Sequence, residues 1–86
     1  MAGRWRADID ALAFTPEGQQ GLCMVHQRAF RTLLRLNPSP QDCGDFFRAN
    51  EAAFRAAATA KIVRDQIVRG TNFHLTSRDV ARHLKK

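Results

Sequence analysis

"FFRANEAAFRAAATAKIVRDQI", residues 46–67, contains the longest amphipathic pattern in this chain of 86 residues. Steps of three and four from Phe46 reach only apolar side chains, which are Ala49, Ala53, Ala56, Ala60, Val63 and Ile67. Because this spacing keeps side chains on one face of an α-helix, it predicts a long helix over about residues 43–69. Asp42 is its expected N-cap, and Gly70 is expected to close it.

The middle of this predicted helix is rich in alanine. Small side chains let a packing partner approach closely, so the alanine face predicts a tight contact. The alanines concerned are Ala49, Ala53, Ala56 and Ala60. Two partners remain open: the apolar face of the same chain, or the same helix of a second copy. Self-association is one of them because so short a chain can build only a modest core.

Two short apolar runs, "DALAFTP" and "GLCMVHQ", precede the long helix and are separated by "EGQQ". Runs of this kind around a glycine-containing turn predict a β-hairpin of residues 11–15 and 21–26. Period-two alternation then predicts one inward face on each strand. The residues expected on these faces are Leu12 and Phe14, then Leu22 and Met24.

The spacing changes from Gln27 onward. Phe30, Leu33 and Leu34 share one helical face, while three arginines lie on the opposite face. These arginines are Arg28, Arg31 and Arg35. The pattern predicts a helix over about residues 27–36, and the prolines of "NPSPQDCG" are expected to end it.

The C-terminal part holds a third strand and a last helix. "TNFHLT" alternates apolar and polar residues, which predicts a short strand at residues 72–75 with His74 facing solvent. Thr76 and Asp79 have the spacing of a capping box and so begin a short terminal helix. A helix-turn-helix reader of DNA needs a recognition helix after such a unit. We expect none, because only Lys85 and Lys86 follow this helix.

These elements predict one α+β domain over residues 1–86, in the order ββααβα. A three-stranded antiparallel sheet, made by the hairpin and the late strand, packs on the long helix. Residues 1–8 and 85–86 are expected to be flexible tails. The expected core residues are Phe14, Leu22, Met24, Phe30, Leu33, Phe54 and Val63, with Phe46 and Ile67 also inward.

The composition is that of a folded globular domain, with 44% hydrophobic and 26% charged residues. No long apolar span or signal-peptide pattern occurs, so we expect a cytoplasmic protein that does not enter a membrane. The two cysteines, Cys23 and Cys43, form no C-x-x-C pair and are expected to be free thiols.

The net charge of +6 is unevenly distributed along the sequence. Residues 1–47 hold five basic and five acidic residues, whereas residues 48–86 hold nine basic and three acidic ones. Such asymmetry can mark a protein with an anionic partner, but charge runs of this kind more often form a solubilising surface. Both interpretations remain open from the sequence.

Four stretches together resemble a small bacterial family known as a domain of unknown function, number fourteen eighty-eight of that series. They are "FTPEG", "VHQRAF", "FFRANEAAFRAAATAKI" and "NFHLTSRDV", and the likeness extends over residues 9–84. Besides the overall pattern, the residues that carry the likeness include Phe14, Gly18, Asn50, Ala57 and Asp79. The resemblance implies a compact α+β fold with a small antiparallel sheet against helices. It implies no activity, ligand or catalytic residue.

The residues themselves give little support to catalysis or metal binding. Cys23 and His26 lie three apart on a predicted strand, so they should face opposite sides and form no thiolate and base pair. The potential metal ligands are scattered without the spacing of a zinc site; they are Cys23, His26, Cys43, His74 and His83. We therefore expect no enzyme, no cofactor and no metal centre.

Two classes of function remain. The first is an interaction or scaffold module that presents the alanine-rich helix, or an exposed sheet edge, to a protein partner or to itself. The alternative is weak, nonspecific nucleic-acid binding through basic helical surfaces. Its contact residues would be Arg28, Arg31, Arg35, Arg78, Arg82, Lys85 and Lys86. The first class is slightly favoured, because no base-reading element accompanies the arginines.

Overall fold

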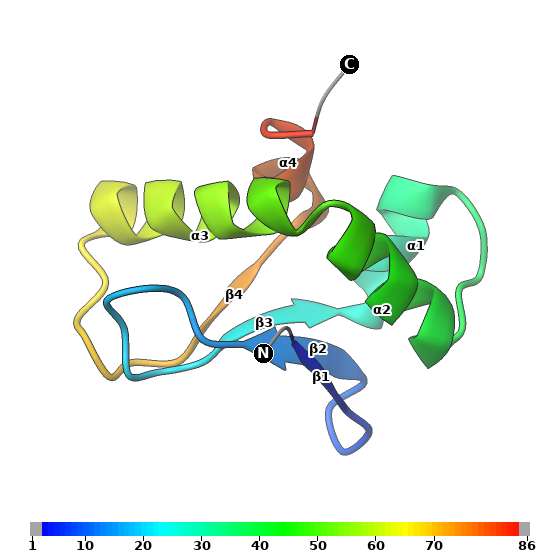
Figure 1. Cartoon of the computed structure of the whole chain (residues 1–86), viewed down its shortest axis with the longest axis horizontal. Coiled ribbons are helices and arrows are strands. Elements are labelled where there is room, and N and C mark those ends of the chain that lie inside the picture. The colour runs from blue at the N-terminus through cyan, green and yellow to red at the C-terminus, as the bar shows by residue number, and fades with distance from the viewer. Residues whose placement is uncertain (1–2, 85–86) are drawn as a thin grey trace.

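The computed structural model describes residues 3–84 and shows an α+β fold of eight elements (Figure 1). In chain order these are β1 (Arg4–Arg6), β2 (Ala11–Phe14), β3 (Cys23–His26), α1 (Gln27–Leu34), α2 (Pro40–Ala49), α3 (Glu51–Asp65), β4 (Phe73–Leu75) and α4 (Ser77–Ala81). The predicted class, the β2–β3 hairpin, the helix after it and the late strand are confirmed. The predicted order ββααβα is wrong in detail, because one strand and one helix are added.

The added strand is β1, in a segment expected to be a flexible tail. It pairs antiparallel with β2, and Trp5 lies opposite Leu12. Trp5 packs partly buried against the core. The strand has only three residues, a tryptophan between two arginines, which is too short for period-two alternation to predict it. The indole of Trp5 provides enough apolar surface to hold the strand in place.

The sheet has the order β1-β2-β3-β4 and is mixed rather than antiparallel. Strands β3 and β4 run parallel, with Cys23 opposite Phe73 and Val25 opposite Leu75. The chain leaves β3 through three helices before it enters β4, and such crossover connections join parallel strands, whereas hairpins join antiparallel ones. The Asn72 side chain assists this pairing by accepting a hydrogen bond from the Leu22 N–H at 2.8 Å.

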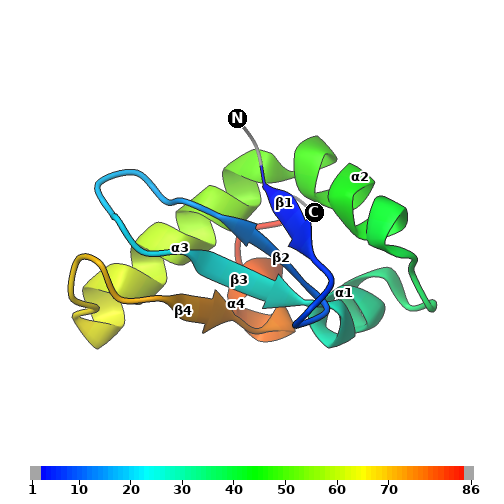
Figure 2. The same cartoon turned by 90° about the horizontal axis from the view of Figure 1, so that it is seen from below.

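All four helices lie on one face of the sheet, and the other face is uncovered (Figures 1 and 2). The covered face is apolar and consists of Leu12, Phe14, Cys23, Val25, Phe73 and Leu75. The prediction was correct for the inward face of β2. It was one residue out in β3, where Leu22 is half-buried and Met24 lies on the uncovered face. The register explains the difference, because Phe14 pairs with Cys23 and so directs it toward the helices.

The predicted helix of residues 43–69 is two helices, α2 and α3. Asn50 separates them with φ −127° and ψ 29°, and its side chain donates to the Phe46 carbonyl at 3.0 Å. Such a side-chain bond competes with helix continuation. Asp42 is the third residue of α2 rather than its cap, because Ser39 caps the helix and exchanges two hydrogen bonds with Asp42. The second helix, α3, ends at Asp65, before Gly70.

An aromatic cluster holds the helices to the sheet. Phe47 lies 5.1 Å from both Phe14 and Phe54, measured between ring centroids, and Phe30 lies 5.8 Å from Phe54. Phe14, Phe30 and Phe54 are thus confirmed as core residues. Phe46, Leu33 and Ile67 pack half-buried around this core. Val63 was expected inside and is 72% exposed, because α3 turns Phe54, Ala57 and Ala58 inward instead.

Candidate anion-binding surface

The five arginines predicted to contact anions lie on two helices that pack against each other. Arg28 and Arg31 lie on α1 and Arg35 caps its C-terminus, while Arg78 lies on α4 and Arg82 caps it. All five are exposed, and none forms an ion pair with a carboxylate of residues 3–84. We call these five residues the arginine surface. Lys85 and Lys86, also predicted contacts, lie outside the described residues.

The cations of α3 are in the opposite situation. Arg55 pairs with Glu51 at 2.7 Å, Lys61 with Asp79 at 3.2 Å, and Arg64 with Asp65 at 3.1 Å. The excess of positive charge in residues 48–86 therefore overstates the charge that α3 offers to a ligand. Conversely, α1 belongs to the half of the sequence with balanced charge, yet its arginines have no partner in the described chain.

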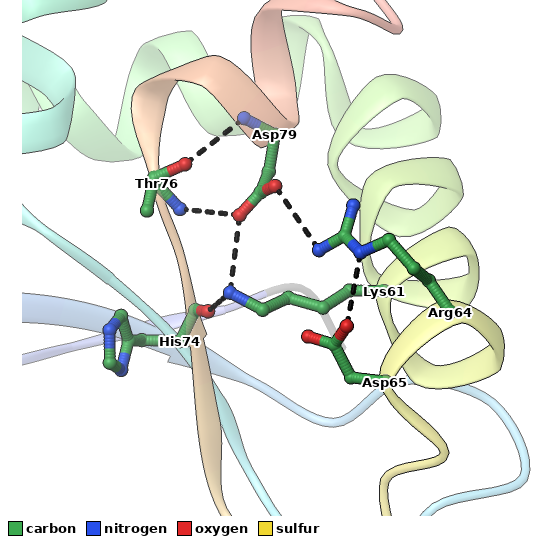
Figure 3. Close-up of polar contacts among 6 residues, drawn as sticks. All are labelled: Lys61, Arg64, Asp65, His74, Thr76 and Asp79. Carbon is green, nitrogen blue, oxygen red and sulfur yellow. Dashed lines mark hydrogen bonds and ion pairs between the residues drawn. The ribbon is translucent and has the colours of Figure 1, made fainter.

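Asp79 is the centre of a polar network that joins α3, β4 and α4 (Figure 3). Its carboxylate accepts from the Thr76 N–H at 2.9 Å and from Lys61 at 3.2 Å, and Arg64 lies 3.6 Å away. The Asp79 N–H in turn donates to the Thr76 hydroxyl, so the predicted capping box is confirmed. Its side chain is only 11% exposed.

This environment changes the acidity of Asp79. Burial alone would raise the pKa of the carboxyl group, but the hydrogen bonds from Thr76 and Lys61 and the positive charge of Lys61 lower it to about 2. Asp79 is therefore a permanent anion at neutral pH and holds Lys61 in place. Lys61 also donates to the His74 carbonyl at 2.7 Å, whereas the His74 ring points away from the network (Figure 3).

The structure brings His26 and His74 together on the uncovered side of the sheet. Their ring centroids lie 5.5 Å apart at 80°, and both side chains line a hollow of about 540 Å³ between α1 and the start of α4. No pattern in the sequence predicted this pair, since the sheet was expected to be antiparallel throughout, which sets another register. Parallel pairing of β3 with β4 aligns the two side chains on one face.

The predicted alanine seam lies largely at the surface. Ala49 and Ala56 are exposed, and Ala53 and Ala60 are half-buried. Close internal packing of this face is therefore wrong, and the alanines in tight contact are Ala57 and Ala58. Together with Ala52, Asn50 and His83, three of the seam alanines line a hollow of about 310 Å³; they are Ala49, Ala53 and Ala56. The second alternative, contact with another copy, stays a prediction.

The cysteines lie in the core, away from these surfaces. Both are free and buried, and burial raises the pKa of Cys23 to about 12 and that of Cys43 to about 11. Neither thiol is thus activated as a nucleophile. Cys23 faces the helices and His26 the opposite side of the sheet, as expected from their spacing.

Two features are absent from residues 3–84. No group of three or more His, Cys, Asp or Glu side chains is arranged to hold a metal ion there. In the same part of the chain, no helix has both the length and the apolar character needed to cross a membrane.

Comparison of the chain with protein-family models, with curated proteins and with solved structures finds no match. The resemblance noted in the sequence therefore stays a prediction, and any function has to be argued from the surfaces described above.

Proposed function

We propose that this protein binds nucleic acid without sequence preference, through the arginine surface of α1 and α4. One observation carries the proposal: five exposed arginines on two adjoining helices have no carboxylate partner within residues 3–84. Arginine suits this role because its planar guanidinium donates two parallel hydrogen bonds to a phosphate.

The same surface argues against recognition of a base sequence. The phenylalanine of α1, Phe30, is fully buried, so its ring is not available for a base to stack on. The last described helix, α4, has five residues and is short for a reader of the major groove. Phosphate contacts of this kind give dissociation constants of about 10⁻⁴ to 10⁻⁶ M at physiological salt.

The test is a salt titration with fluorescently labelled random duplex. The slope of log affinity against log salt changes by about 0.9 for each phosphate contact, so five arginines predict a slope of up to about −4.5. A triple variant of the α1 arginines, Arg28→Gln, Arg31→Gln and Arg35→Gln, should reduce the size of this slope by up to about 2.7. Absence of duplex binding even at about 50 mM salt would refute the proposal, and the charge would then serve solubility.

A second candidate is self-association through α3, which the uncovered alanine face favours. Ala49 at the end of α2 lines a hollow together with Ala53 and Ala56 of α3, and Val63 of α3 is exposed. A second copy of this face would bury these apolar groups. Sedimentation equilibrium tests the idea: a dimer whose dissociation constant rises in an Ala56→Glu variant supports it, and a monomer at all concentrations contradicts it.

A further inference from the structure

We propose that the hollow between α1 and the start of α4, here the α1–α4 pocket, binds the terminal phosphate monoester of a nucleic-acid strand. This inference rests on the proposed function, because it assigns the end of the nucleic-acid strand to a defined site. The volume of the α1–α4 pocket, about 540 Å³, is in the usual range for small-ligand sites. The pocket adjoins the arginine surface, since Arg28 belongs to both.

Three side chains at this pocket are donors without a partner. His26 comes from the end of β3, His74 from β4, and Arg28 from the first turn of α1. Within residues 3–84, no hydrogen bond or ion pair engages their imidazole or guanidinium groups; the recorded bonds of His74 and Arg28 involve only their backbone carbonyls. Ser77 lines the same hollow.

The charge at the pocket favours an anion. No carboxylate of residues 3–84 lines it. Asp79, on the adjoining helix, is directed toward Lys61 and Arg64 instead (Figure 3). Asp10 lines a neighbouring hollow, which it shares with His26, Arg28 and Arg31, so cationic and imidazole groups outnumber the carboxylate there. Cationic ligands are therefore disfavoured, and an oxyanion would find donors on two sides.

The number of donors favours a monoester over a backbone phosphodiester. A terminal phosphate carries a charge of about −1.5 to −2 and three strong acceptor oxygens, which matches three separate donors. A diester has one fewer free oxygen and a smaller charge. The volume of the hollow also leaves room beyond the phosphate for part of the attached nucleoside.

The experiment compares two single-stranded oligonucleotides of one sequence, one with a 5′-phosphate and one with a 5′-hydroxyl. The protein should bind the phosphorylated strand about tenfold more tightly at equal salt, as expected for charged hydrogen bonds made only by the terminal group. In a His26→Gln, His74→Gln double variant the preference should disappear, while the salt slope for random duplex stays unchanged. The control His83→Gln removes a histidine outside the pocket and should keep the preference.

Each outcome separates this inference from the proposed function. Equal affinity of the protein for both strands, or a preference that survives in the double variant, overturns the pocket and leaves duplex binding intact. A free mononucleotide is the other source of a phosphate monoester, so adenosine monophosphate is titrated as well. If duplex and strands fail to bind but the mononucleotide binds saturably and loses affinity in the double variant, the pocket binds a phosphate monoester, but both its assignment to a strand end and the proposed nucleic-acid binding fail.

Folding of the variants is checked by circular dichroism. If the double variant is unfolded, the single His74→Gln is used, because His74 is exposed on the edge strand β4. Its replacement is expected to lower the preference for the phosphorylated strand, and an unchanged preference would again count against the pocket.

Discussion

The cations of α3 and those of α1 and α4 are the same chemical groups in contrasting surroundings. On α3, Arg55, Lys61 and Arg64 each have a carboxylate within 3.2 Å. On α1 and α4, the five members of the arginine surface have none in the described chain. The comparison shows that formal charge along a sequence does not locate the charge available to a ligand. Paired cations stabilise the fold, whereas unpaired cations remain free for binding.

The largest expected effect follows from removing the negative charge of Asp79, which pairs with Lys61 and Arg64 of α3. Asp79→Asn should destabilise the protein by about 2 kcal/mol at neutral pH, since a pKa lowered to about 2 reflects strong stabilisation of the buried carboxylate. Urea denaturation measures this loss. Asp45→Asn, which removes an exposed i,i+3 ion pair with Arg48, is the control and should cost only a few tenths of a kcal/mol.

The pH dependence of the Asp79 effect has a definite sign. The folded-state pKa lies below the ordinary value of 3.8, so the stabilisation is present above about pH 4 and is lost as the pH falls toward 2. The difference in unfolding free energy between the wild-type protein and Asp79→Asn should therefore shrink over that interval. A difference that stays constant down to pH 2 would mean that the carboxylate charge is not the cause.

The next effect contrasts the two sides of α3 itself. Ala58 is fully buried, so Ala58→Leu should cost about 1 to 3 kcal/mol through overpacking. Ala56 is exposed, and Ala56→Leu should change the unfolding free energy of the monomer by less than about 0.5 kcal/mol. If Ala56→Leu proves as costly as Ala58→Leu, the alanine face is covered in solution, and a concentration-dependent mass would identify a second copy as its cover.

A smaller effect tests paired against unpaired arginine directly. Arg31→Gln removes an unpaired cation of α1 and should reduce the size of the salt slope for duplex binding by about 0.9. Arg55→Gln removes a cation that is paired with Glu51, and the slope should stay unchanged. Equal changes in the two variants would show that binding follows net charge rather than the arginine surface.

The smallest expected effect tests whether an arginine of α3 contacts nucleic acid once its ion pair is removed. Glu51→Gln frees Arg55 from its partner and should cost only a few tenths of a kcal/mol, because this i,i+4 pair is partly exposed. Arg55 does not belong to the arginine surface, so duplex affinity should not rise. A clear gain in affinity would extend the binding surface onto α3.

Local rules predicted those parts of the fold that depend on neighbours in sequence. The Thr76 and Asp79 cap, the β2–β3 hairpin and the periodic face of α1 follow from such rules and are confirmed. The break at Asn50 was missed because the apolar series continues through it. The inward face of α3 was missed because alanines occur on both sides, and the larger area of Phe54 decides which side is buried.

The candidate sites were predictable only in part. Periodicity predicted that the arginines are exposed on their helices. That the two sets lie on adjoining helices depends on the packing of α1 against α4. The meeting of His26 with His74 depends on the parallel pairing of β3 and β4. Contacts between segments about fifty residues apart leave no periodic trace in a single sequence.

The parallel strand β4 also decides the order in which this protein can fold. Its partner Cys23 lies fifty residues before Phe73, so the pairing closes a long loop at an entropic cost of about 3 to 4 kcal/mol. The hairpin and the helices are local and can form first, which makes β4 a late addition to the sheet. His74, Arg78 and Arg82 take their places with it or after it. A chain still emerging from the ribosome therefore carries only the α1 part of the arginine surface, and ligand binding can report completed folding.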